Sequence, residues 1–402
     1  MGRRQLQLMK LDGVLVNTAR VAVLTEAALV EHLQTHPDSG QVHNPEGQHR
    51  VVVTKVLPGE RWTKLLVSAN CRVEVCTAAE PILGTDHIAA LIGSKCDAVI
   101  GQLTETAYSN YAVGFNNVAV AEATARGIPV GNTPGVLTET SAELAAALTL
   151  AAARRVAEGD AFMRAGHFQG WLPTLFVGKL LQGKKLGVVG AGRIGAAYAR
   201  MMVEGHKMDL LYFSRSTNTS LEDYVRDYGS FLESHGERAV TAKRCETLEQ
   251  LLQEADVVSL HCSLTDSTRH LIGRRQLQLM KPDAVLVNTA RGPVVDEAAL
   301  VEHLQARPDF RAGLDVFEDE PRVQQGLAGC QNAVLLPHIA SATEWTRSGM
   351  ATLAAANVAA ILQGYPVWGR SDALPFVDGP FEQIPKAAPS IVNATELGLA
   401  VM

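Results

Sequence analysis

The chain has 402 residues, of which 47% are hydrophobic and 19% charged, so its composition excludes a disordered or collagen-like protein. At roughly 150 residues per domain, this length predicts two domains. Its 42 acidic residues outnumber its 36 basic ones, and a formal net charge of −6 argues against nucleic acid or an anionic membrane as a partner.

Metal and membrane sites are not predicted either. The apolar stretch 142–156 is interrupted by charged residues before it reaches the roughly 20 residues that span a bilayer. The cysteines are scattered without CxxC pairs, which argues against a zinc site and against a secreted disulfide framework. We interpret them as reduced core thiols: Cys71, Cys76, Cys96, Cys245, Cys262 and Cys330.

The N-terminus contains an internal repeat. Residues 2–38 match residues 273–309 at about 29 of 37 positions. Each copy predicts helix, buried strand and helix, a piece of an α/β sheet that cannot bury its apolar faces alone. At the turn after the strand, Val21-Ala22 replaces Gly292-Pro293. We interpret residues 1–47 as an appended duplicate of the segment 272–309 or a gene-model artefact, and expect them to be poorly ordered and to contribute no core.

From Arg50 onward, strands and helices alternate, which predicts a parallel sheet. Only six residues separate Gly101 from the next apolar strand, whereas a parallel crossover needs a dozen or more. Either the two strands are not neighbours, or a crossover helix is missing near 105–108, which is the reading we favour. The expected strands are 51–55, 71–76, 98–101 and 108–113, and the expected helices are 59–69 and 85–92.

A long helix is predicted from the capping box at Thr140 and Glu143 to Arg164. A βαβ unit follows, with strand 184–189, a helix to Val203 and strand 209–214. A second long helix covers 343–363, and the tail after it, with five prolines, predicts irregular structure.

The turn of the βαβ unit reads Gly190-Ala191-Gly192-Arg193-Ile194-Gly195, and it directly follows a strand and opens a helix. In that context the glycines predict a dinucleotide site whose pyrophosphate binds at the helix N-terminus. The next strand ends at Ser214-Arg215-Ser216, without the acidic residue that binds the ribose of NAD. This favours NADP(H), and the alternative is an enzyme that uses either cofactor.

A cation, a carboxylate and a histidine follow the later strands, at Arg291, Glu320 and His338. The carboxyl ends of parallel strands are where doubly wound sheets bind ligands. An anchor, an orienting acid and a proton donor are the groups needed to reduce a 2-keto acid, so these residues are the predicted catalytic site.

The chain resembles the D-isomer-specific 2-hydroxyacid dehydrogenases, and most closely the plant and algal hydroxypyruvate reductases, from about residue 48 to the end. The resemblance is carried by four strings: 131–140 (GNTPGVLTET), 170–177 (GWLPTLFV), 197–205 (AYARMMVEG) and 345–352 (WTRSGMAT).

This resemblance implies an α/β fold of two Rossmann-like, doubly wound parallel-sheet domains. A dinucleotide-binding domain, 135–338, would be inserted into a discontinuous substrate domain, 48–134 plus 339–378, with 379–402 as a C-terminal tail. It also implies a homodimer.

The resemblance further assigns His338 as the acid/base and Glu320 as its partner, which stabilises the imidazolium. Arg291 would bind the carboxylate and the carbonyl oxygen of the substrate. Cofactor contacts would come from Thr289 and from Asp315, which would hold the nicotinamide carboxamide. The implied substrate contacts are Leu103, the backbone N–H groups of Val113 and Gly114, Ser341, and Trp171 reaching a neighbouring subunit.

The implied reaction is reduction of hydroxypyruvate to D-glycerate, or of glyoxylate to glycolate, with NAD(P)H, and NAD(H) is the subfamily default. Two rivals stay open: a dinucleotide-sensing, corepressor-like binding protein, and an inactive isoform with an incomplete substrate domain. The chain ends Leu-Ala-Val-Met instead of Ser-Lys-Leu, so we expect a cytoplasmic location, with the peroxisome as the alternative.

Overall fold

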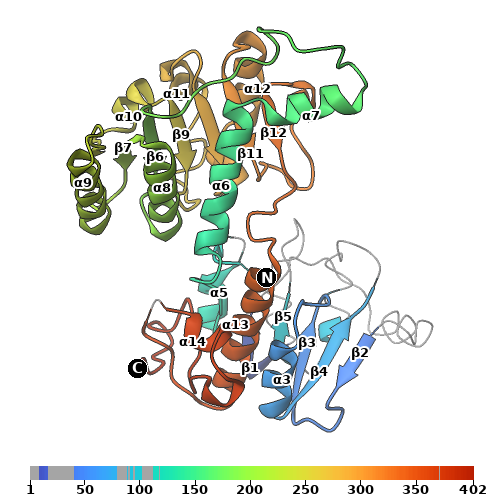
Figure 1. Ribbon diagram of the computed structural model, residues 1–402. Coiled ribbons are helices and arrows are strands. Elements are labelled where there is room, and N and C mark those ends of the chain that lie inside the picture. The colour runs from blue at the N-terminus through green and yellow to red at the C-terminus, as the bar shows by residue number, and fades with distance from the viewer. Residues whose placement is uncertain are drawn as a thin grey trace. The chain divides into compact units, whose positions relative to one another are not determined.

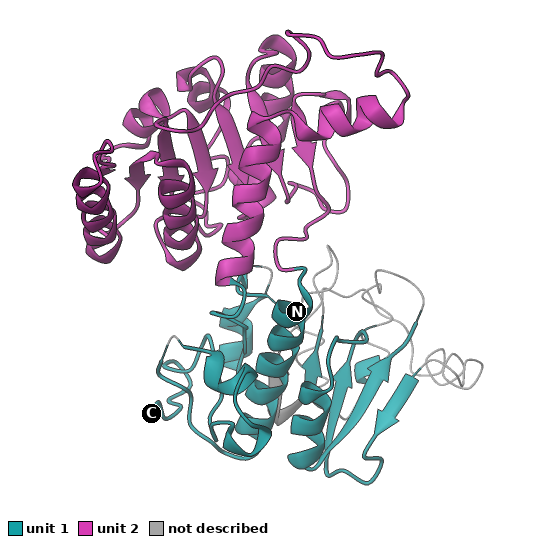
Figure 2. Cartoon of the chain, in the orientation of Figure 1, with its two compact units in different colours: residues 1–137, 342–402 teal, residues 138–341 magenta. Residues whose placement is uncertain are grey.

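The computed structural model describes residues 9–16, 40–78, 88, 91–93, 96–101, 112–116, 118–370 and 372–402. The chain forms two compact units, coloured separately in Figure 2. Unit 1 comprises residues 1–137 and 342–402, and unit 2 comprises residues 138–341. Unit 2 is therefore inserted into a discontinuous unit 1, and the tail 379–402 belongs to unit 1.

Unit 1 is built on a five-stranded sheet of order β1-β5-β3-β4-β2, in which β2 alone is antiparallel to its neighbour (Figure 1). All five residues of β5 are buried, as a strand inside a parallel sheet requires. The strands are β1 (Met9–Val16), β2 (Gly40–His43), β3 (His49–Val53), β4 (Cys71–Cys76) and β5 (Cys96–Ile100). The helices are α3 (Arg61–Ser68), α5 (Val120–Ala125), α13 (Glu344–Leu362), α14 (Leu374–Val377) and the 3₁₀ helix η3 (Phe381–Gln383).

The N-terminal segment 1–47 contributes two described strands to unit 1. β1 pairs in parallel with β5, and β2 pairs with β4. β3 pairs with one edge of β5, and the backbone N–H and C=O groups of the other edge need hydrogen-bond partners. β1 provides these partners. We expected residues 1–47 to be poorly ordered and to contribute no core; their described strands β1 and β2 extend the sheet of unit 1 at its two edges. Residues 1–8 and 17–39 lie outside the described residues.

The predicted strand 108–113 is not found in its described part, because Ala112 and Val113 form a bend. Residues 102–111, with the suspected missing crossover near 105–108, lie outside the described residues. Of the predicted helix 85–92, the described residues Ile88, Leu91 and Ile92 are helical.

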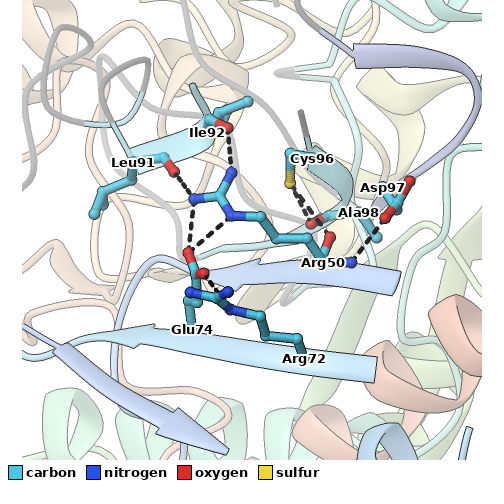
Figure 3. A network of polar contacts seen from close by, with 8 residues as sticks. All are labelled: Arg50, Arg72, Glu74, Leu91, Ile92, Cys96, Asp97 and Ala98. Atoms are coloured by element: carbon cyan, nitrogen blue, oxygen red, sulfur yellow. Dashed lines mark hydrogen bonds and ion pairs between the residues drawn. The ribbon is translucent and has the colours of Figure 1, made fainter. Parts of the chain in front are cut away.

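Arg50 holds the sheet of unit 1 together through a network of polar contacts (Figure 3). Its guanidinium donates to the Glu74 carboxylate on β4 at 2.6 Å and to the carbonyls of Leu91 and Ile92 at 2.8 and 2.6 Å. Its backbone N–H donates to Asp97 on β5 at 2.7 Å. One side chain thus links β3 with β4 and with the helical residues beside them.

Unit 2 contains a seven-stranded, fully parallel sheet of order β12-β11-β10-β9-β6-β7-β8. Strand order reverses between β6 and β9, and this switch point is where doubly wound sheets bind ligands. The strands are β6 (Lys185–Val189), β7 (Asp209–Phe213), β8 (Ala242–Arg244), β9 (Val257–Leu260), β10 (Val285–Asn288), β11 (Arg311–Leu314) and β12 (Ala333–Leu335).

Helices cover both faces of this sheet, and each face has its own apolar cluster. One face packs against α6 (Thr138–Ala153), α8 (Arg193–His206) and α9 (Thr219–Ser234). The other packs against α10 (Leu248–Glu254), α11 (Arg274–Leu279) and α12 (Glu297–Ala306). The remaining helical elements are α7 (Val156–Arg164), η1 (Gly292–Val294) and η2 (Leu327–Gly329).

The helix predicted from Thr140 to Arg164 is two helices, α6 and α7. The chain breaks at Arg155, whose left-handed backbone (φ 58°) is incompatible with a continuous α-helix. The Arg155 guanidinium bonds to Glu158 and lies 5.0 Å from the centre of the Phe176 ring, which stabilises the break. α6 begins at Thr138, so Thr140 lies inside the helix and is not its cap.

Candidate active site

The catalytic residues predicted from sequence come together beyond the carboxyl ends of β10, β11 and β12. The Nδ1 atom of His338 lies 2.8 Å from Oε2 of Glu320. The other carboxylate oxygen of Glu320 accepts the backbone N–H of Phe317 at 2.9 Å. Both side chains are about one-third exposed, at 31% and 33%, so the pair is held by the protein and is still accessible.

Two opposing effects act on the Glu320 carboxyl. Burial raises its pKa, but the hydrogen bond and charge of His338, the Phe317 N–H and the charge of Arg291 outweigh burial and leave the pKa below its ordinary value. Burial also lowers the pKa of Arg291, and the nearby Glu320 opposes that shift. Glu320 is therefore a carboxylate that interacts with both His338 and Arg291.

Asp315 fixes the backbone beside the histidine. It is fully buried, and its two carboxylate oxygens accept the N–H groups of Ile339 and Ala340, each at 2.8 Å. Burial raises the pKa of Asp315 despite these donors. His338 itself has a left-handed backbone, with φ 55°. Asp315 thus holds the segment that follows His338, and its contact with a nicotinamide carboxamide stays a prediction.

Arg291 stands in a turn shaped by Asn288, which donates to the Arg291 carbonyl at 2.9 Å and accepts the Ala290 N–H at 3.0 Å. The next residue, Gly292, lies so close to the following strand end that a Cβ atom would be 1.9 Å from the Phe317 carbonyl carbon. Only glycine fits there, and the turn after β10 therefore packs directly on the segment that carries Glu320.

The glycine-rich turn has the shape of a phosphate cradle. Gly190 has φ 96°, and a Cβ there would lie 2.7 Å from the Cys262 nitrogen; a Cβ on Gly195 would lie 2.1 Å from the Gly190 oxygen. Beside Gly192, by contrast, no described atom lies within 4 Å of the Cβ position. No described side chain caps α8 there, so the N–H groups of Arg193 and Ile194 begin a helix open to an anion.

Two arginines lie at the carboxyl ends of the neighbouring strands β7 and β8. Arg215 follows β7, and Arg244 at the end of β8 donates to the carbonyls of Ser214 and Arg215 at 3.0 and 3.4 Å. Sequence reasoning missed Arg244, because only the pairing of β7 with β8 brings the two strand ends together. A hollow of about 390 Å³ lies nearby, lined among others by Arg193, Asn218 and Ser220.

Comparison with known proteins identifies the family. A profile described as "D-isomer specific 2-hydroxyacid dehydrogenase, NAD binding domain" matches residues 146–340. A glycerate dehydrogenase from Cucumis sativus is 56% identical over 376 residues, which cover 90% of this chain and 98% of that protein. A peroxisomal glycerate dehydrogenase from Arabidopsis thaliana is 55% identical over 381 residues, covering 91% and 98%. The chain belongs to the D-isomer-specific 2-hydroxyacid dehydrogenase family.

Solved structures show the same fold for this dehydrogenase. A protein from Thermus thermophilus is 35% identical with a TM-score of 0.68, covering 85% of this chain and 99% of its own. An NADPH-dependent glyoxylate/hydroxypyruvate reductase from Sinorhizobium meliloti, in complex with NADP and malonate, is 29% identical with a TM-score of 0.60, covering 78% and 93%. The expected α/β fold with two Rossmann-like domains is confirmed, and unit 2 contains the NAD-binding domain of the dehydrogenase.

The other predicted residues of the dehydrogenase are spread over the chain. Val113 and Gly114 lie in a bend of unit 1, where the Val113 carbonyl accepts the side-chain amide of Asn132 at 2.9 Å. Ser341 is the last residue of unit 2, and Trp171 lies in the segment after α7 with 81% of its surface exposed. Leu103 lies outside the described residues.

Two further findings concern other classes of site. Among the described residues, no group of three or more histidine, cysteine, aspartate or glutamate side chains is arranged to hold a metal ion. No described helix of the dehydrogenase is both long and apolar enough to cross a membrane.

Proposed function

We propose that this dehydrogenase reduces hydroxypyruvate to D-glycerate, and glyoxylate to glycolate, with NADPH as the favoured reductant. The observation that carries the proposal is the His338–Glu320 pair, 2.8 Å apart, with Arg291 acting on the same carboxylate. The similarity to glycerate dehydrogenases over about nine-tenths of the chain supports the choice of substrate.

In the proposed reaction His338 donates a proton to the keto oxygen of the substrate. Glu320 stabilises the imidazolium before the transfer, and Arg291 binds the substrate carboxylate and stabilises the charge that develops on the keto oxygen. A positioned proton transfer of this kind contributes about 10² to 10⁴ in rate. The dinucleotide, when bound, supplies the hydride.

The residues of unit 2 fit such a dinucleotide. Gly192 leaves open space at the start of α8, and among the described residues the buried hydroxyl of Thr289 has no hydrogen-bond partner, as expected for a group that meets a ligand. We favour NADPH because no carboxylate follows β7, whereas Arg215 and Arg244 bring two positive charges there. NADH remains the alternative that the measurements below decide.

We further assign unit 1 as the substrate domain, with the N–H groups of Val113 and Gly114 as donors to the substrate carboxylate. We also assign the segment from α7 to Leu180 as a contact between two subunits of a homodimer. Large apolar side chains of this segment are exposed to solvent, which is typical of a surface that binds another protein chain. They are Val156, Met163, Phe168, Trp171, Leu172, Val177 and Leu180.

The proposal is tested by mixing purified protein with NADPH and either hydroxypyruvate, glyoxylate or pyruvate, and following oxidation of the cofactor. We expect turnover with hydroxypyruvate and glyoxylate, and identification of the hydroxypyruvate product as the D-isomer of glycerate. Tight binding of NADPH without turnover on any of the three acids would contradict the proposal and favour a sensor.

A further inference from the structure

We propose that Glu297 is a positioning residue for the catalytic carboxylate Glu320, and through it for His338. Glu297 was not among the site residues predicted from the sequence. The inference rests on the proposed function, because it takes the Glu320–His338 pair as the proton donor.

Glu297 is the first residue of α12 and is only 2% exposed. Its carboxylate accepts the backbone N–H of Glu318 at 2.7 Å and also a backbone hydrogen bond from Gln324. These two donors lie on either side of Glu320 in the chain. One buried carboxylate therefore holds the segment 318–324 on both sides of the residue that faces His338.

The ordinary role of an acidic residue in a first helical turn does not account for this placement. Asp296 already caps α12, since its side chain accepts the Ala299 N–H at 2.9 Å. Burying a second carboxylate there is unfavourable, and burial raises the pKa of Glu297 although the Glu318 N–H opposes the shift. The contacts that compensate are those to the Glu320 segment.

Other contacts hold this segment and Phe317, the residue before it. His270 Nε2 lies 2.5 Å from the Glu318 carboxylate, and Gly292 packs on Phe317 with no room for a Cβ. The charges that act on Glu297 are the nearby carboxylates of Glu318 and Asp319, both of like sign. Without the Glu297 carboxylate, the N–H groups of Glu318 and Gln324 lose their acceptor inside the protein. The segment then shifts, and the Glu320–His338 distance is no longer fixed.

The test compares Glu297→Ala, Glu297→Gln and Glu297→Asp with the wild type. The readouts are kcat, the pH profile of kcat/KM, and the Kd of NADPH from quenching of protein fluorescence. We expect Glu297→Ala to lower kcat by about tenfold to a hundredfold and to move the alkaline limb of the profile to lower pH. Glu297→Gln, whose amide oxygen still accepts an N–H, should recover most of kcat. The Kd of NADPH should change less than about twofold.

Glu302, on the same helix but exposed and paired with Arg274, provides the matched control, and Glu302→Gln should behave as wild type. If Glu297→Ala does not fold, Glu297→Asp decides, because its shorter side chain keeps the charge but cannot span to both N–H groups. Wild-type kcat and pH profile in that variant, or a lower Tm with an unchanged profile, would overturn the inference. An inactive wild type would instead contradict the proposed function.

Discussion

His338 and Glu320 are 18 residues apart in the chain, yet the Nδ1 atom of the histidine lies 2.8 Å from a carboxylate oxygen of the glutamate. The left-handed backbone of His338 and the hydrogen bonds that the next two N–H groups donate to Asp315 fix the main chain at the histidine. Because Nδ1 faces Glu320, Nε2 is the ring nitrogen left to act on a substrate.

This geometry makes a prediction for Glu320→Gln. The amide keeps the shape but removes the negative charge beside the imidazole, so the alkaline limb of the pH profile of kcat/KM should move to lower pH. At pH 7, kcat/KM of Glu320→Gln should be about tenfold or more below the wild-type kcat/KM. The exposed Glu302 on α12 gives the control, since Glu302→Gln should leave the profile unchanged. An unshifted profile in Glu320→Gln would separate Glu320 from the proton donor.

Cofactor choice should follow the charge after β7. Ser214→Asp is expected to convert NADPH preference into NADH preference, because the new carboxylate repels the 2′-phosphate and accepts hydrogen bonds from the ribose hydroxyls of NADH. With solvent screening, the repulsion should be about 1 to 3 kcal/mol, or roughly tenfold to a hundredfold in the ratio of kcat/KM values. Ser230→Asp on α9 controls for added charge. A wild type that already prefers NADH would refute this reading of residues 214–216.

Arg244 should contribute to the same preference. Arg244→Gln keeps a donor for the Ser214 carbonyl but loses the charge, so the Kd of NADPH should rise by about tenfold while that of NADH stays constant. Arg238, which pairs with Asp209 at the opposite end of β7, gives the control variant Arg238→Gln. Equal weakening of both cofactors by Arg244→Gln would show that Arg244 only supports the turn.

A stability prediction concerns Asp256, a buried carboxylate before β9. Burial raises its pKa, but the Lys185 N–H and the Lys281 ammonium, both at 2.9 Å, outweigh burial and leave the pKa below its ordinary value. A lowered pKa stabilises the fold above the unfolded pKa of about 3.9, and that stability is lost as the pH falls through the folded value.

Asp256→Asn should therefore lower the free energy of unfolding by about 1 to 3 kcal/mol at pH 7, measured as a lower Tm. The difference from wild type should shrink below about pH 4, where the wild-type carboxylate becomes protonated. Asp223→Asn, at an exposed site paired with Arg226, is the matched control. A Tm difference that does not change with pH would show that the charge of Asp256 does not stabilise the fold.

The sequence predicted the residues whose position follows from a strand end. The turn 190–195 comes directly after β6, and Arg291 and His338 come within three residues of the ends of β10 and β12; parallel strands bring these carboxyl ends to one edge of the sheet. Strand ends alone do not predict the contact between Glu320 and His338. This contact depends on the left-handed backbone at His338, which no residue pattern indicates.

The features that the sequence did not predict depend on tertiary contacts. The break at Arg155 interrupts an alanine-rich segment with good helix propensity, and it is stabilised by Phe176, some twenty residues away. Arg244 and Glu297 acquire their partners only when β7 pairs with β8 and when α12 packs beside the Glu320 segment. A local sequence pattern does not predict such tertiary contacts.

The central claim is that His338 is the proton donor of a 2-keto acid reductase, and the variant His338→Asn tests it most directly. The measurement is steady-state reduction of hydroxypyruvate by His338→Asn, beside the Kd of NADPH for the same preparation. The account predicts a loss of kcat of about 10² or more, with a Kd within about twofold of wild type, because the imidazole acts on the substrate and not on the dinucleotide. Wild-type kcat in His338→Asn would contradict it.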